Sequence, residues 1–312
     1  MRKFEIKCKG KPIKDFKDNV LVSSEHTKVS ALFEAVSKTI GLPETRLRLL
    51  VKDRVLKKED NICDILEEEC VYVKDLGPQI AWKTVFLVEY IGPLLIHPLI
   101  YGCPLIQQLL YGKVVHHSSS QRVVFILVLL HFIKRELETL WVHRFSMDTM
   151  PRRNLFKNSF HYWILGGINM AYWTYGPWFS PLYQSHIILL FFVILWGFSE
   201  YANFKTHLIL RSIRPPKSRI RQIPKGFGFN LVSCPNYFFE YTSWLIVASI
   251  SRSLSCKFLL LIYFLIIIAL AWIFLAVSGV QMWLWALKKH RRYIDEFNDY
   301  PKQRKVMFPY IL

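Results

Sequence analysis

Short periodic apolar patterns fill the first 76 residues of the chain. Phe4, Ile6 and Cys8 alternate with polar residues, which predicts a strand, and residues 20–22 predict a second one. Apolar residues at helical spacing then predict a helix over 27–40. The spacing places five of them on one helix face: Val29, Leu32, Phe33, Val36 and Ile40.

Glycine and proline mark the end of this helix, and two more strands follow it. Gly41 and Pro43 supply a C-cap and a stop. The segments RLRLLV at 46–51 and CVYV at 70–73 predict strands. The order strand, strand, helix, strand, strand is that of a ubiquitin-like β-grasp (α+β) module, so we expect such a domain over 1–76.

Beyond Gly77 the apolar stretches become long enough to cross a membrane, which takes about 20 residues per helix. The last stretch, 256–287, allows one tilted span or two helices broken near Ser278 and Gly279. We therefore expect a multi-pass α-helical membrane domain over 77–312 with about six or seven transmembrane helices. The stretches cover 84–110, 123–133, 160–178, 186–202, 231–250 and 256–287.

Charge separates the same two parts of the chain. Residues 1–81 hold 16 of the 41 Lys and Arg and 14 of the 23 Asp and Glu, which leaves 25 basic and 9 acidic residues for the rest. A mean hydropathy of +0.22 with a net charge of +18 is too apolar for an ordinary soluble basic protein. The six cysteines form no CxxC and no Cys/His cluster at zinc spacing, so we expect no metal site.

Ionisable residues recur at helical spacing within or beside the apolar stretches. Each costs about 2.5–3.5 kcal/mol on insertion scales, so such residues normally face a cavity or a partner. For any one intramembrane Glu or Asn, a structural interhelical hydrogen bond is as reasonable an interpretation as catalysis. Such residues form three groups. The smallest pairs Asn236 with Glu240, each followed by a tyrosine. The two longer stripes are His131, Lys134, Arg135 and Glu138, and Glu200, Asn203, His207, Arg211 and Arg214.

Two basic segments allow two interpretations. Residues 211–225 and 288–292 fit cytosolic loops that obey the positive-inside rule. They also fit a ligand with several phosphates, because guanidinium groups bind phosphate oxygens bidentately. The chain contains no GxGxxG, GxSxG, Walker A or HExxH motif, so a nucleotide would bind among the helices and loops of the membrane domain.

Five long motifs lie between residue 73 and residue 312: VKDLGPQIAWKTVFLVEYIGPLL (73–95), FIKRELETLWVHRFS (132–146), TMPRRNLFKNS (149–159), LVSCPNYFFEYTSW (231–244) and KKHRRYIDEFNDYPKQRKVMFPYIL (288–312). They resemble very-long-chain (trans-2,3-) enoyl-CoA reductases of the steroid 5α-reductase-like membrane family. The resemblance implies about seven helices in the endoplasmic reticulum membrane, a cytosolic N-terminal domain, and NADPH bound near the cytosolic side.

The resemblance also implies the roles of individual residues. Tyr237 and Lys134 are the expected catalytic pair: Tyr237 would give a proton to the developing enolate, and Lys134 would stabilise its charge. Asn236 and Glu240 would hold the nicotinamide carboxamide. The expected cofactor-binding residues are Asn236, Glu240, Arg135, Asn203, Arg211, Arg214, Lys289, His290, Arg291 and Tyr293.

The implied reaction is the NADPH-dependent reduction of very-long-chain trans-2-enoyl-CoA to acyl-CoA, the last step of the fatty-acid elongation cycle, which supplies sphingolipids among other lipids. Implied partners are membrane lipids and the other elongation enzymes, not nucleic acid. Three alternatives stay open: a reductase of another conjugated lipid such as a 3-oxo-Δ4 steroid or a polyprenol, a non-catalytic membrane scaffold, and, with less support from the position of the polar stripes, a transporter.

Overall fold

The structure, a computed structural model, describes residues 1–52, 54–65, 70–145, 148–179, 185–214, 222–251, 261–301 and 303–310, with backbone alone for 261–271. The chain forms two compact units. The first comprises Met1–Trp82 and Met147–Leu155, and the second comprises Lys83–Ser146 and Phe156–Leu312.

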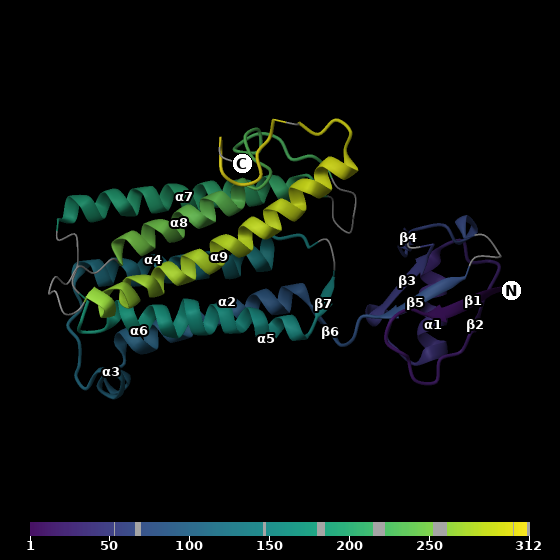
Figure 1. The fold of residues 1–312 in the computed structure, drawn as a ribbon, viewed down its shortest axis with the longest axis horizontal. Coiled ribbons are helices and arrows are strands. Elements are labelled where there is room, and N and C mark those ends of the chain that lie inside the picture. Colours follow the sequence, from purple (N-terminus) through teal and green to yellow (C-terminus); the bar gives the residue numbers. More distant parts are fainter. Residues whose placement is uncertain are drawn as a thin grey trace. The chain divides into compact units, whose positions relative to one another are not determined.

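The first unit is built on a five-stranded mixed sheet with the strand order β2-β1-β5-β3-β4 (Figure 1). β1 pairs with β2 in antiparallel and with β5 in parallel orientation, and β3 is antiparallel to both β5 and β4. The predicted strands are therefore present, with β4 as an addition. The strands are β1 Arg2–Cys8, β2 Asn19–Val22, β3 Leu47–Val51, β4 Arg54–Val55 and β5 Val71–Asp75.

One helix, α1 (Val29–Ile40), packs its apolar face against this sheet. Its buried residues are the five whose spacing predicted the helix, so that prediction is confirmed. The helix ends at Gly41, whose φ of 65° lies in the left-handed region that a glycine adopts without steric cost. Two short 3₁₀ helices, Glu44–Arg46 and Ile62–Asp64, complete the element order.

A second, small sheet also belongs to the first unit and was not predicted. β6 (Gln79–Ala81) pairs in antiparallel orientation with β7 (Thr149–Pro151), so that Ile80 lies opposite Met150. A three-residue strand carries too little periodicity to be found from sequence. The pairing joins residues about 70 positions apart in the chain, and it extends the first unit beyond the boundary proposed at residue 76.

The second unit is a bundle of helices, among which α7 packs closely along α8 and α8 along α9 (Figure 1). Each predicted apolar stretch overlaps a described helix over most of its length. The elements are α2 Trp82–Gly102, α3 Pro104–Tyr111, α4 Ser119–Trp141, α5 Arg153–Ser159, the π-helix η3 Phe160–Asn169, α6 Met170–Tyr175, α7 His186–Ser212, α8 Pro235–Ile250 and α9 Leu261–Glu296.

Two of the described helices, α2 and α7, are long and apolar enough to cross a membrane by length and composition. The predicted total of six or seven spans remains a prediction. The alternative of a helix break near Ser278 is wrong, because α9 continues through this position. Gly279 instead allows close helix packing: a Cβ there would lie 2.7 Å from the Tyr241 ring of α8. Residues 256–260 of the last stretch lie outside the described residues.

An ion pair in the first unit makes its stability depend on pH. Arg46 donates hydrogen bonds to both carboxylate oxygens of Asp75, at 3.0 and 2.5 Å, and these bonds are the main cause of a lowered Asp75 pKa. The pair therefore stabilises the unit fully above the ordinary carboxylate pKa of about 3.9, and this contribution is lost as the pH falls through the lowered native pKa.

We predict that Arg46→Met lowers the unfolding free energy of this unit by about 1 kcal/mol at pH 7 and has little effect at pH 2. Hydrogen exchange of the β3 and β5 amides in the full-length protein, corrected for intrinsic rates, measures this difference. Lys38→Met is the matched control, because Lys38 pairs with Glu34 on the surface of α1, where such pairs contribute little. A loss for Arg46→Met that is the same at both pH values would contradict the prediction.

Candidate active site

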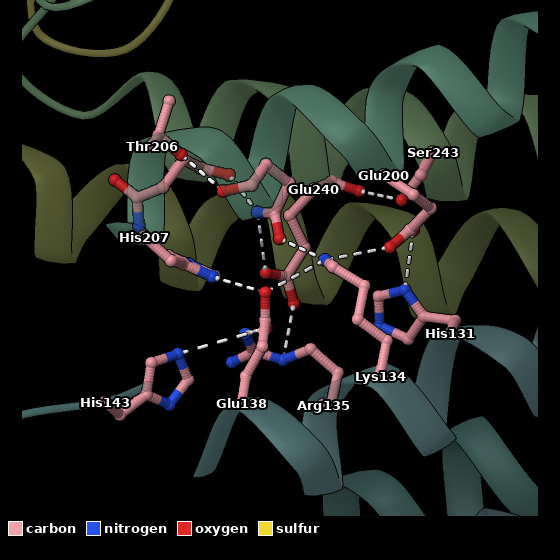
Figure 2. A network of polar contacts seen from close by, with 12 residues as sticks. His131, Lys134, Arg135, Glu138, His143, Glu200, Thr206, His207, Glu240 and Ser243 are labelled. Carbon is pink, nitrogen blue, oxygen red and sulfur yellow. Dashed lines mark hydrogen bonds and ion pairs between the residues drawn. The ribbon is translucent and has the colours of Figure 1, made fainter. Parts of the chain in front are cut away.

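A buried carboxylate on α4 lies at the centre of a polar network in the second unit (Figure 2). Glu138 is 1% exposed, and it receives a hydrogen bond of 2.8 Å from Nη1 of Arg135, one turn earlier on the same helix. His207 of α7 approaches its other oxygen, with Nδ1 at 3.0 Å. A carboxylate in an apolar bundle needs such partners, because unpaired burial of its charge is costly.

Lys134 connects this carboxylate to a second one. Its ammonium nitrogen lies 3.0 Å from Oε2 of Glu200, 2.5 Å from Oδ1 of Asn203 and 3.4 Å from Oε1 of Glu138. The contact with Asn203 is a hydrogen bond, and those with the two carboxylates are ion pairs. Two of the helical stripes, one on α4 and one on α7, therefore face each other through Lys134 (Figure 2).

Asn203 carries the network on to α8. Its amide nitrogen donates a 2.8 Å hydrogen bond to the backbone carbonyl of Asn236 and lies 3.4 Å from Oε2 of Glu240. Arg135 approaches the other oxygen of Glu240, with Nε at 3.9 Å. Four predicted cofactor-binding residues and Lys134 are thus brought together by α4, α7 and α8.

The side chain of Asn236 is incompletely satisfied within the protein. The residue is 6% exposed, and no described residue gives a hydrogen bond to its Oδ1 atom. Buried amide oxygens normally have a donor. Together with the Glu240 carboxylate one turn along α8, this oxygen offers acceptors to a bound amide, and a primary carboxamide has two N–H donors to give. The residues present therefore fit the carboxamide of a nicotinamide cofactor.

The side chains of Glu138, His143 and His207 also lie close enough together to consider a metal ion. Charge argues against one. Arg135 and Lys134 already neutralise Glu138, and a divalent cation would be placed beside both of them. The geometry supports a carboxylate-centred ion-pair network at this position.

Arginines collect where α4 and α7 end. Arg144, just after α4, and Arg214, just after α7, exchange hydrogen bonds from their guanidinium groups to each other's backbone carbonyls, and Arg144 also donates to the carbonyl of Arg211 at 3.2 Å. Cations near a helix C-terminus are favoured by the helix dipole. The two guanidinium groups of Arg144 and Arg214, placed together in this way, also suit an anion with several phosphate oxygens.

The predicted residues of the last helix are divided among different surroundings. Ser233 Oγ lies 2.6 Å from Nδ1 of His290 and 2.7 Å from the Tyr300 hydroxyl. Burial lowers the pKa of His290, so the ring makes this contact in its neutral form. Tyr293 is buried and stacks on Tyr300, with ring centroids 5.5 Å apart. Both residues thus hold the C-terminal segment, whereas Arg291 is exposed.

Tyr237 packs toward the last helix. It packs with the cluster that includes Met282 and Ala286 of α9, and its ring centroid lies 6.3 Å from that of Trp285. Lys289, on α9, is close enough to interact with it electrostatically. The described contacts of Lys134 are with Glu200, Asn203 and Glu138, so the proposed catalytic pair does not meet directly in this structure.

Sequence reasoning left out several residues of the site. Arg144 lies in the motif 132–146, but it falls outside the helical spacing of the ionisable stripe, so the pattern gives it no role. Glu89 of α2 is 1% exposed and one of its oxygens has no hydrogen-bond partner among the described residues. The signal for Glu89 was available, because a carboxylate within an apolar run is costly unless it has a role. Its neighbour Tyr90 accepts a 2.8 Å hydrogen bond from Arg135.

Comparisons with known proteins agree with this arrangement. Residues 148–312 match the family described as 3-oxo-5-alpha-steroid 4-dehydrogenase. A Schizosaccharomyces pombe protein with an enoyl reductase name is 43% identical over 291 residues, which are 91% of each chain. The very-long-chain enoyl-CoA reductase of Dictyostelium discoideum is 36% identical and aligns over 93% of this chain and 94% of its own.

A Caenorhabditis elegans relative with a very-long-chain enoyl-CoA reductase name is also 36% identical, over 95% of this chain and 96% of its own. The chain therefore belongs to the 3-oxo-5-alpha-steroid 4-dehydrogenase family, and its relatives along nearly the whole length are named as enoyl-CoA reductases. The predicted resemblance is confirmed, and membership in this family supports an oxidoreductase.

Arg135 is expected to be the main stabilising cation of the network. Arg135→Leu would leave Glu138 and Glu240 short of a positive charge and remove the donor to Tyr90, so we predict a loss of about 3–5 kcal/mol in the free energy of unfolding. Urea unfolding in detergent micelles, followed by tryptophan fluorescence, measures it. Arg291→Leu, at an exposed position, is the control and should change stability by less than about 0.5 kcal/mol. Equal effects of the two substitutions would contradict the assignment.

Proposed function

We propose that this protein reduces the trans-2 double bond of very-long-chain trans-2-enoyl-CoA with NADPH and yields the saturated acyl-CoA. Two findings support the proposal. The relatives that align along nearly the whole chain carry enoyl-CoA reductase names. The observation within the structure that carries most weight is the buried, unpartnered Oδ1 of Asn236 beside Glu240, which suits a nicotinamide carboxamide.

The cofactor would be held at two points of the second unit. Asn236 and Glu240 would accept the carboxamide N–H groups, with Asn203 and Arg135 fixing the Glu240 carboxylate. The guanidinium groups of Arg144, Arg211 and Arg214 would bind phosphate oxygens. Bound NADPH supplies the hydride for the reduction.

The remaining chemistry falls to side chains. Addition of a hydride to Cβ builds negative charge on the thioester oxygen and requires a proton at Cα. Tyr237 would donate that proton, because a phenol ordinarily keeps its proton at neutral pH. Lys134 would supply positive charge to the site, either directly or through Asn203, its 2.5 Å contact.

The proposed setting is the last step of fatty-acid elongation in the endoplasmic reticulum membrane, with the product used for sphingolipids among other lipids and the other elongation enzymes as partners. We further propose that residues 1–76 form a cytosolic ubiquitin-like domain. The strand order β2-β1-β5-β3-β4 with one helix across the sheet supports this grasp-like arrangement.

A reductase of a steroid is the second candidate, because the matching family is described by a steroid reaction. The two candidates differ in what they ask of the site. An acyl-CoA carries phosphate groups, whereas a steroid carries none. An acyl-CoA reductase therefore needs cationic side chains for its substrate in addition to those that bind the cofactor phosphates, and a steroid reductase does not. Assays with trans-2-hexadecenoyl-CoA and with a 3-oxo-Δ4 steroid, side by side, distinguish them.

Tyr237→Phe is expected to lower kcat for trans-2-hexadecenoyl-CoA by about 10²–10⁴, the usual contribution of a positioned proton donor. Lys134→Ala should also reduce turnover strongly. NADPH oxidation by membranes containing the protein measures both. Tyr241→Phe, the same substitution one turn along α8, is the matched control and should retain wild-type turnover. Full activity of Tyr237→Phe would exclude Tyr237 as the donor.

Asn236→Leu tests the carboxamide site independently of turnover. Loss of a buried acceptor for a bound amide costs about 1–3 kcal/mol, so the Kd for NADPH should rise by roughly 5- to 150-fold. Quenching of tryptophan fluorescence by NADPH gives the Kd. Asn230→Leu, in the exposed loop before α8, should leave the Kd unchanged. If both variants bind NADPH like the wild type, the cofactor is not held by Asn236.

A further inference from the structure

Two buried residues of the polar stripes, His131 and Glu200, have no place in the proposed chemistry. They meet across the interface of α4 and α7, where Nδ1 of His131 lies 2.8 Å from Oε1 of Glu200 (Figure 2). His131 is 3% and Glu200 6% exposed. The His131 ring packs edge-to-face on Trp244 of α8, with centroids 4.6 Å apart, so the hydrogen bond has a fixed orientation.

The second oxygen of Glu200 is committed to Lys134. Nζ of Lys134 lies 3.0 Å from Oε2, as an ion pair without the alignment of a hydrogen bond. Glu138 also approaches the same ammonium group, but at 3.4 Å, and it is already bound by Arg135 and His207. Of the two carboxylates, Glu200 therefore lies closer to Lys134, and Lys134 and His131 are its two partners among the described residues.

The position of Lys134 in turn determines the orientation of Asn203. Because Lys134 can only donate, Asn203 must direct its Oδ1 toward Lys134 and its Nδ2 toward α8. The Nδ2 atom then reaches the carbonyl of Asn236 and the carboxylate of Glu240. A displaced Lys134 would leave Asn203 free to turn, with an amide donor lost to α8.

We propose that Glu200, oriented by His131, is a positioning residue that holds Lys134 against Asn203 and so sets the face of α8 that carries Asn236 and Glu240. Glu200 acts through Lys134 and makes no contact with substrate or cofactor. This inference rests on the proposed function, since it assigns Glu200 to the reductase site.

A double-mutant cycle tests the inference. Glu200→Gln keeps the size of the side chain and removes its charge, and it should lower kcat for trans-2-hexadecenoyl-CoA at least tenfold in an otherwise wild-type protein. In a Lys134→Met background the same substitution should change the rate constant of reduction less than twofold. Single-turnover experiments measure this rate constant in all four proteins of the cycle. A merely structural Glu200 would cause the same loss in both backgrounds, and that result would overturn the proposal.

A second pair of variants keeps the test decisive if Lys134→Met has too little activity to measure or Glu200→Gln does not fold. Glu200→Asp shortens the carboxylate, and Lys134→Arg lengthens the cation. We expect Glu200→Asp to lower kcat at least tenfold. The double variant Glu200→Asp/Lys134→Arg should recover at least a third of wild-type kcat. Absence of rescue in a double variant that binds NADPH with wild-type Kd would refute the positioning role.

Glu136→Gln is the matched control, because it makes the same change on α4 outside the network, and it should retain kcat within twofold of wild type. Failure of the proposed function gives a different result. In that case the wild-type protein itself does not oxidise NADPH with any enoyl-CoA, whereas failure of the positioning role leaves an active wild type and an equally active Glu200→Gln.

Discussion

Burial of carboxylates in an apolar helix bundle is the constraint on which the site depends. Glu138, Glu200 and Glu240 come from three different helices; the first two are buried and Glu240 is partly buried. Lys134 and Arg135 provide the positive charge from adjacent positions of α4, and each contacts carboxylates on more than one helix. The ion pairs therefore fix how α4, α7 and α8 face one another, and packing of the apolar residues follows this arrangement.

The same constraint explains why a polar site exists there at all. Lys134 donates to the Oδ1 atom of Asn203, which turns the Nδ2 atom toward α8. There Nδ2 donates a hydrogen bond to the backbone carbonyl of Asn236. The side-chain oxygen of Asn236 is then left without a donor. A buried acceptor beside this network favours the binding of a ligand that carries a donor, since the cost of the missing hydrogen bond is recovered when the donor binds.

Much of the fold could be predicted from periodicity, because the spacing of apolar residues reports which face of an element is buried. The face of α1 and the positions of the helical stretches follow from this rule. The stripes on α4 and α7 were likewise visible, but their partners were not: nothing local indicates that Lys134 pairs with Glu200 rather than with Asp or Glu elsewhere. The β6–β7 pair, Arg144 and the role of Gly279 depend on contacts between distant segments, so sequence spacing carried no signal for them.

Asn236 and Tyr237 show why neighbouring residues can serve different functions. Successive positions on a helix point about 100° apart, and Tyr237 packs against α9 while the Asn236 carbonyl and the Glu240 carboxylate meet Asn203 of α7. Reduction of a conjugated double bond needs a hydride at one carbon and a proton at the next, and the two must arrive from separate donors. In the proposed reaction, one turn at the start of α8 would supply both an acceptor for the cofactor and a phenol. The ion pairs of Lys134 orient Asn203 and, through it, the face with Asn236 and Glu240. The position of Tyr237 depends instead on packing against α9.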